Sequence, residues 1–212
     1  MHVVVDSDVL KDAREADLNR HLDMLSRCVE RARAIGAPSP SITMILRTAD
    51  SPPALILAHM TDTLRRAGAG ARAILARLEP EEDLRRLISS LSELSPSEPA
   101  QALIRWARNP RLLDAHEQAT YGEDMCWSGD AMRRESDRRN VLALFNEGVP
   151  DRMRLGRLAF EALWAISSPV PDRHLNGRAA AKPAGAFQPS QKTPVAVSPL
   201  RPSLQAWPLI RH

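Results

Sequence analysis

The segment ITMILRTADSPPALILAHMTDTLRRAGAGARAILARL, residues 42–78, decides the fold expected for this chain. Its first part, Ile42–Arg47, is short and apolar, which is typical of a buried strand. A helix is expected from Pro52 to about Ala67, because a proline in the first turn loses no hydrogen bond and glycines follow. Residues 71–78 read as a second strand. Strand, helix and strand with short junctions predict a βαβ unit with two parallel strands.

Helical patterns flank this unit on both sides. Apolar residues recur at spacings of three and four over residues 9–35, and Gly36 ends the pattern. A further helix is expected after Pro80, with an apolar face made of Leu84, Leu87, Ile88 and Leu91. The β-branched run at 2–5 is a candidate edge strand.

The elements after residue 100 are less sharply defined. The stretch AQALIRWAR at 100–108 fits either a short helix or a buried strand, and a strand at 102–107 is favoured because Asn109-Pro110 follows as a turn. The remaining expected elements are a strand at 125–128 that ends at Gly129, a helix at 133–145 and a last helix at about 155–166.

Composition changes sharply after Ser168. Eight of the 17 prolines fall between Pro169 and Pro208, among Gly, Ala, Ser and Gln. Such a segment buries too little apolar surface to offset its ordering entropy, so residues 172–205 are expected to be disordered. The prediction is therefore an α/β domain over 1–168, with a small, mostly parallel sheet flanked by helices, and a basic Pro-rich tail over 169–212.

The basic character of the chain belongs to that tail. The tail has six basic residues and one acid, a net charge of +5, whereas the whole chain is at +3, which leaves −2 for residues 1–168. A globally basic nucleic-acid-binding domain is therefore disfavoured. The tail could contact nucleic acid or an anionic surface by salt-sensitive attraction. Its apolar end, 204–210, is either random composition or a short motif that docks on a protein partner.

The two cysteines indicate the compartment. Cys28 and Cys126 lie far apart and form no CxxC or zinc-type spacing, so we expect two reduced, buried thiols in a cytoplasmic protein. No signal peptide is visible, and no window has the apolar length of a membrane span.

The segment HEQATYGEDMCWSGDAMRRESDRRN, residues 116–140, concentrates the residues that could carry chemistry. The expected strand ends in Ser128, Gly129 and Asp130 and leads into a helix, a geometry that favours anions. Arg133 and Arg134 oppose the helix dipole there. They either pair with nearby carboxylates or contact a phosphate, for which the guanidinium fork is well suited.

This layout resembles the phospholipase D superfamily over about residues 40–148. In that family a strand carries His-x-Lys, an Asp follows the Lys by five residues, and a Gly-Ser then precedes an Asn and a helix. Gly70–Leu75 resembles the upstream strand, His116 stands at the His position, and Trp127–Asp130 lies near the Gly-Ser-x-Asn. The resemblance implies an α/β fold and makes His116 the candidate nucleophile.

The departures from the family pattern concern its catalytic groups. Gln118 replaces the phosphate-binding Lys, Glu123 replaces the Asp, and the Gly-Ser order is inverted. The chain has one such segment, whereas the family's enzymes use two His from two motifs or a dimer. The resemblance therefore implies a degenerate member that keeps the fold without the phosphodiesterase chemistry, in which His116 is structural or on the surface.

Other catalytic and metal motifs are missing from the sequence. There is no Gly-rich phosphate loop, HExxH, GxSxG or EF-hand spacing, and no cofactor is indicated. Asp6 and Asp8 could bind a metal but read more simply as a helix cap and a surface charge, so no metal site is assigned.

Three functions remain open. The first is a non-catalytic or weakly catalytic protein that binds an anionic or phosphorylated small molecule near residues 116–139. The second is a regulatory or interaction protein that acts through its tail. The third is a phosphodiesterase-type hydrolase that uses His116. For the first, Ser128 and Gly129 should end a strand, Arg133 or Arg134 should start a helix, and His116 should lie on a neighbouring strand or loop.

Overall fold

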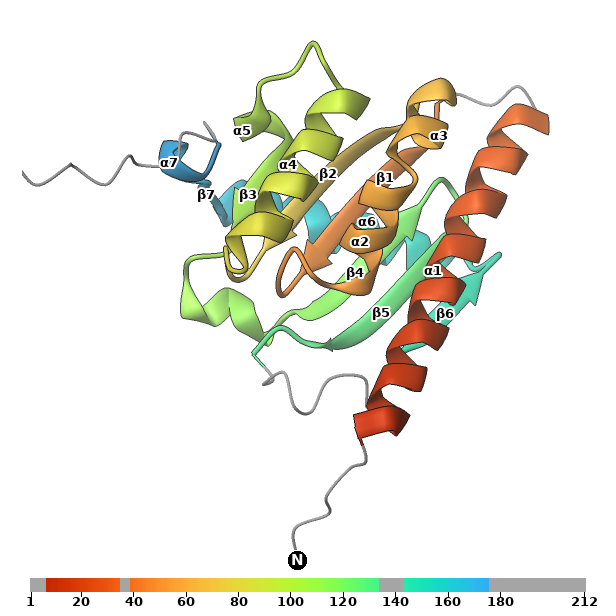
Figure 1. The fold of residues 1–212 in the computed structure, drawn as a ribbon, viewed down its shortest axis with the longest axis horizontal. Coiled ribbons are helices and arrows are strands. Elements are labelled where there is room, and N and C mark those ends of the chain that lie inside the picture. Colours follow the sequence, from red (N-terminus) through yellow and green to blue (C-terminus); the bar gives the residue numbers. More distant parts are fainter. Residues whose placement is uncertain (1–6, 35–38, 134–142, 176–212) are drawn as a thin grey trace, which may run out of the picture. The chain divides into compact units, whose positions relative to one another are not determined.

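The computed structural model describes residues 7–34, 39–133 and 143–175, with side chains from Arg14 onward. Its centre is a seven-stranded sheet in the order β6-β5-β4-β1-β2-β3-β7 (Figure 1). The strands are β1 (Ser41–Leu46), β2 (Gly70–Leu75), β3 (Ile104–Trp106), β4 (His116–Tyr121), β5 (Met125–Ala131), β6 (Leu144–Glu147) and β7 (Ser168–Pro169).

The predicted βαβ unit forms the middle of the sheet. β1 pairs in parallel with β2, with Ile42 opposite Ala71, and β2 pairs in parallel with β3. The other four pairings are antiparallel, so a parallel sheet is found at β1-β2-β3 but not at the outer strands. One of these pairings has a local cause: β4 and β5 are joined by a tight hairpin in which Gly122 has φ +65°, and a hairpin makes its two strands antiparallel.

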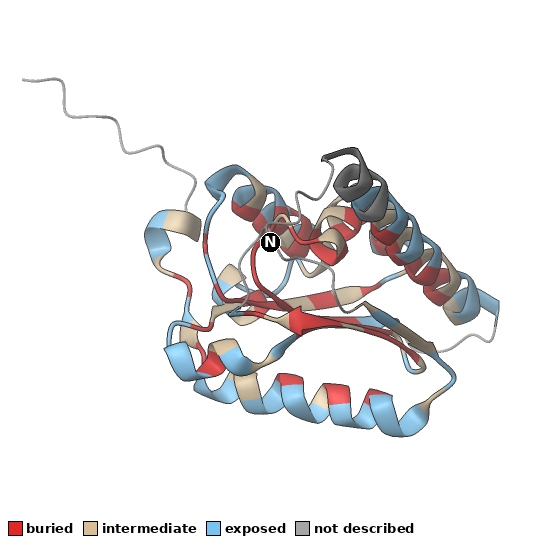
Figure 2. Ribbon diagram, turned by 90° about the horizontal axis from the view of Figure 1, so that it is seen from below, coloured by how far each residue is buried: buried red, intermediate tan, exposed pale blue. Residues whose placement is uncertain are grey.

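Helices cover both faces of the sheet (Figure 2). One face carries α1 (Ser7–Ala34), α2 (Pro52–His59), α3 (Thr61–Arg66) and α4 (Glu81–Leu94), and the other carries α6 (Pro150–Ile166). Alternation along β1 serves both layers: Met44 and Leu46 enter the larger core under α1–α4, whereas Ile45 packs with Phe160 of α6 in a smaller core. The α/β class with flanking helices is thereby confirmed.

Several element boundaries differ from the prediction. The ambiguous stretch at 100–108 divides into α5 (Ala100–Leu103) and β3, so both interpretations hold in part. The expected helix at 133–145 is wrong for Leu144 and Phe145, which belong to β6, because an apolar run this short fits a half-buried strand equally well. Residues 134–142 lie outside the described residues, as does the edge strand expected at 2–5.

The folded unit continues past the predicted boundary at residue 168. Pro169 pairs with Arg105 across β3 and β7, Val170 is buried, and α7 (Asp172–Leu175) follows. Disorder was therefore the wrong prediction for 172–175. The rest of the predicted tail, from residue 176 onward, lies outside the described residues.

Candidate functional site

Three arginines follow the three parallel strands at their carboxyl ends. Arg47 comes directly after β1, and Arg77 and Arg108 each come two residues after β2 and β3. The backbone N–H of Arg77 donates to the carbonyl of Arg47 at 2.8 Å, so these strand ends are neighbours. In α/β folds, ligands bind outside the carboxyl ends of parallel strands. We call this part of the molecule the carboxyl edge.

Arg47 and Glu117 form a buried pair at the carboxyl edge. The Glu117 carboxylate accepts hydrogen bonds from the Arg47 backbone N–H at 2.8 Å and from the Ser51 hydroxyl at 2.9 Å, and the Arg47 guanidinium lies 3.4 Å away. That guanidinium also donates to the carbonyl of Ala131 at 3.1 Å. The pair therefore fixes the loop after β1 against β4 and β5, which makes its role structural.

His116 is the first residue of β4 and lies at the same edge, with its side chain exposed. Its Nδ1 is 2.8 Å from the Gly129 carbonyl, and a carbonyl only accepts, so Nδ1 carries the proton. The lone pair of the neutral ring is then on Nε2. His116 thus lies on the strand next to β5, one of the two positions expected for it, and its ring is in the tautomer that a nucleophile or base at Nε2 requires.

Ser128, Gly129 and Asp130 lie inside β5 and do not form the predicted turn into a helix. β4 and β5 contain a bulge, since His116 pairs with Ala131 while Gln118 pairs with Ser128. A Cβ on Gly129 would come within 2.6 Å of the Trp127 ring, so this glycine allows close packing. Asp130 is buried. The strand thus continues three residues past the predicted end.

Of the two predicted ligand-binding arginines, the structure describes one. Arg133 is exposed, lies 3.0 Å from Asp114 and donates to the carbonyl of Pro110 at 3.4 Å, so it forms a surface ion pair, with a carboxylate other than those at 123, 124, 135 and 137 that the sequence offered. Arg134 lies outside the described residues.

Gln118 and Glu123, the departures from the phospholipase D pattern, both hold α6. The Gln118 amide donates to the carbonyl of Gly156 at 2.9 Å. Glu123 forms an ion pair with Arg157 at 2.8 Å, and this hydrogen bond lowers the pKa of Glu123. Glu123 lies at the opposite end of β4 from His116. Neither side chain therefore assists His116.

The exposed cations of the carboxyl edge were not identified from the sequence. Arg77, Arg108 and Arg111 are exposed, the last in the short 3-10 helix Pro110–Asp114 that leads from the end of β3 to the start of β4. Across the residues described here no carboxylate pairs with any of them. The Arg108 guanidinium lies 5.7 Å from the centre of the Trp106 ring. A signal was present, because an arginine follows each apolar strand run. Guanidinium groups at the carboxyl ends of strands that have no carboxylate partner are suited to bind a phosphate or another anion.

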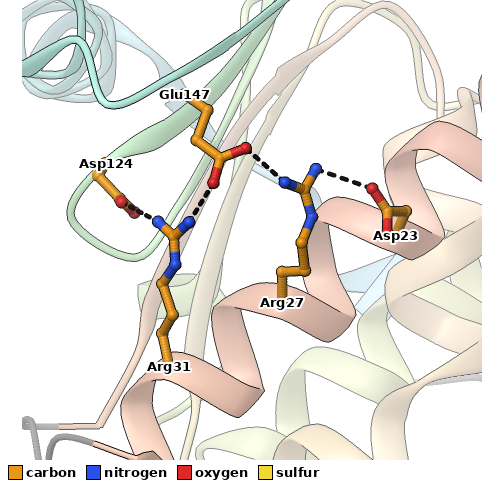
Figure 3. A network of polar contacts seen from close by, with 5 residues as sticks. All are labelled: Asp23, Arg27, Arg31, Asp124 and Glu147. Carbon is orange, nitrogen blue, oxygen red and sulfur yellow. Dashed lines mark hydrogen bonds and ion pairs between the residues drawn. The ribbon is translucent and has the colours of Figure 1, made fainter.

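The far end of the molecule is held by a chain of ion pairs between α1 and the outer strands (Figure 3). Arg27 pairs with Asp23 at 2.7 Å and with Glu147, while Arg31 pairs with Glu147 and Asp124. All five side chains are partly exposed, and such pairs contribute little individually. Their role is to fix α1 over the β4–β5 hairpin and β6.

A buried histidine lies under the same helix. His21 Nδ1 is 2.7 Å from the Tyr121 hydroxyl, and its ring packs at 4.9 Å from Trp127 and 5.0 Å from Phe145. Burial in this aromatic setting lowers the pKa of His21 to about 3. The ring is therefore neutral at ordinary pH and serves packing.

A small pocket of about 240 Å³ opens beside the hairpin, lined by Cys28, Pro40, Gly122 and Met125 among others. Burial raises the pKa of Cys28 to about 11, so its thiol is not a reactive thiolate. Cys28 and Cys126 are buried and unpaired, as expected.

Comparison with family models, curated proteins and solved structures finds no match to this chain. Within ranges 7–34, 39–133 and 143–175, no helix has the length and apolar character needed to cross a bilayer. In the same ranges, no three His, Cys, Asp or Glu side chains cluster as metal ligands would.

Proposed function

We propose that this chain is a phospholipase D-like α/β protein that binds an anionic or phosphorylated ligand at its carboxyl edge, with little or no hydrolytic activity. The observation that carries the proposal is the set of three exposed arginines, Arg77, Arg108 and Arg111, that no described carboxylate neutralises. His116, exposed at the same edge, would add a hydrogen-bonding group. A ligand with several anionic oxygens suits such a set.

The side chains around His116 favour binding over catalysis. In the phospholipase D pattern a Lys two residues after the His binds the phosphate, and here Gln118 occupies that place and donates to α6. Glu123, at the Asp position, is held by Arg157. A lone His116 lacks both the phosphate-binding cation and a second His to protonate the leaving group. A cytoplasmic location belongs to this proposal, because both cysteines are unpaired thiols.

The binding proposal predicts stabilisation by phosphates. Inorganic pyrophosphate or a nucleotide should raise Tm, by the equivalent of about 2.7 kcal/mol when the ligand is at 100 times its Kd. The double variant Arg77→Ala/Arg108→Ala should bind about 100-fold more weakly, because two charge-assisted hydrogen bonds are lost.

The control carries the same charge change elsewhere. Arg66→Ala/Arg85→Ala removes two exposed helix arginines whose hydrogen bonds run to backbone carbonyls of their own helices, and its affinity should equal that of the wild type. If both double variants bound the ligand equally weakly, the loss of affinity would come from the change in net charge and not from a site at the carboxyl edge. If neither pyrophosphate nor the nucleotide changed the Tm of the wild type, the binding proposal would be wrong.

A second candidate, a phosphodiesterase-type hydrolase, is favoured by the His116 tautomer. Its Nε2 lone pair is suited to attack phosphorus, with Gly129 holding the ring in place. If this activity exists, His116→Ala should abolish hydrolysis of a generic phosphodiester such as bis(p-nitrophenyl) phosphate, whereas His59→Ala should not. Hydrolysis that survives His116→Ala would exclude His116 as the nucleophile, and no hydrolysis by the wild type would exclude this function.

The tail-mediated regulatory function stays a prediction from the sequence, because residues from 176 onward are not described.

A further inference from the structure

The outward face of α6 is apolar, although it lies on the outside of the molecule. Among the described residues, four large hydrophobic side chains are exposed, and three of them are on this helix: Leu155 at 61%, Leu158 at 59% and Ile166 at 64%. Exposed alanines complete the face, at positions 159, 162 and 165. Figure 2 shows α6 below the sheet, with its exposed residues turned away from the strands.

These residues form one continuous stripe. Spacings of three and four along α6 place Leu155, Leu158, Ala162 and Ile166 on the same side of the helix. The opposite side is already occupied, since Met153, Gly156 and Phe160 are buried against the sheet. Single exposed leucines need no explanation, but a contiguous stripe of this kind marks an interaction surface.

The charged residues beside the stripe indicate which kind of surface can pack against it. Arg154 and Glu161 lie seven residues apart, and on a helix they share one flank of the stripe. When two identical helices pack antiparallel about a two-fold axis, the same flank of each faces its counterpart. An axis near residues 157–158 then sets Arg154 of each chain opposite Glu161 of the other.

We propose that α6 is the interface between two copies of this chain, packed antiparallel with Leu155 and Leu158 at the centre. The arrangement is self-complementary, which a two-fold interface requires. Ala159 and Ala162 allow the two helices to approach closely. Glu161 already accepts from Arg72 at 2.6 Å, and Arg154 of the second copy would add a second cation to that carboxylate. Among the described residues of its own chain, Arg154 pairs only with Asp151, loosely, at 3.9 Å.

The first test is the oligomeric state of the full chain. Sedimentation velocity over a concentration series should show a concentration-dependent dimer. Leu158→Arg should raise the dimer Kd by about tenfold or more, because a charge would enter the apolar centre. Leu144→Arg, which changes the exposed hydrophobic residue that lies outside α6, should dimerise like the wild type. A wild-type monomer at about 1 mM, or a dimer that Leu158→Arg leaves intact, would overturn the proposal.

A charge exchange tests the antiparallel geometry. Arg154→Glu and Glu161→Arg should each weaken dimerisation, by placing like charges opposite each other. The double variant Arg154→Glu/Glu161→Arg should recover most of the wild-type affinity. Because Glu161→Arg also breaks the ion pair with Arg72, the rescue is the decisive result. A double variant no better than the worse single variant would contradict the proposed arrangement.

Discussion

Glu117→Ala is expected to lower the free energy of unfolding by about 3–5 kcal/mol, the range seen when one partner of a buried ion pair is removed. The Glu117 carboxylate accepts from the Arg47 backbone and the Ser51 hydroxyl, and it faces a guanidinium that is only 1% exposed. Without it, a buried cation and two buried donors lose an acceptor. Urea denaturation followed by circular dichroism measures the change.

The control for Glu117→Ala is a carboxylate of the same type in water. Glu82→Ala removes a partner of Arg86, in a pair whose carboxylate is 82% exposed, and should cost less than about 1 kcal/mol. Losses of equal size in the two variants would mean that burial of the Arg47–Glu117 pair has no special weight.

Acidification from pH 7 to pH 5 is expected to destabilise the protein by about 2 kcal/mol through His21 alone. Its pKa is about 3 in the folded protein and 6.5 in the unfolded chain, because the ring is buried among Tyr121, Trp127 and Phe145. Between these values the unfolded chain binds a proton that the folded protein does not. Stability is therefore full above pH 6.5 and falls as the pH drops toward 3.

The variant that isolates this effect is His21→Gln, which does not titrate but keeps a polar group beside the Tyr121 hydroxyl. Its free energy of unfolding should change by much less between pH 7 and 5, even if it starts lower. If the free energy of unfolding of His21→Gln still fell between pH 7 and 5 as in the wild type, groups other than His21 would cause the pH dependence.

Apolar runs predicted the buried strands β1 and β2 well, and Pro52 begins the helical connection between them, although the one expected helix is divided into α2 and α3. β4 gave no such signal, since its residues are mostly polar. Those polar groups are satisfied by residues distant in sequence: Gln118 by Gly156, and Thr120 by Thr43 at 2.7 Å. Hydrophobic periodicity cannot detect a strand whose polar side chains find partners only after folding. The sequence patterns therefore assigned no strand to residues 116–121.

The candidate site was located only in part. His116 was expected on a neighbouring strand or loop and lies on β4, whereas Ser128 and Gly129 were assigned to a turn that is a continuous strand with a bulge. The bulge depends on the pairing of β4 with β5, which residue spacing does not encode. Arg77 and Arg108 could have been found, because the rule that ligands gather at carboxyl ends of parallel strands applies to β2 and β3 as well as to the later segment.

The strands at the two margins of the sheet determine how molecules of this protein can meet. β6 has four residues and ends at Glu147, whose carboxylate is bound by two arginines of α1, and β7 has two residues, one of them Pro169. A short strand, a charge and a proline are the features that block growth of a sheet from one molecule into the next. Amyloid-like stacking through these edges is therefore disfavoured, and association is left to side chains on the helical surfaces.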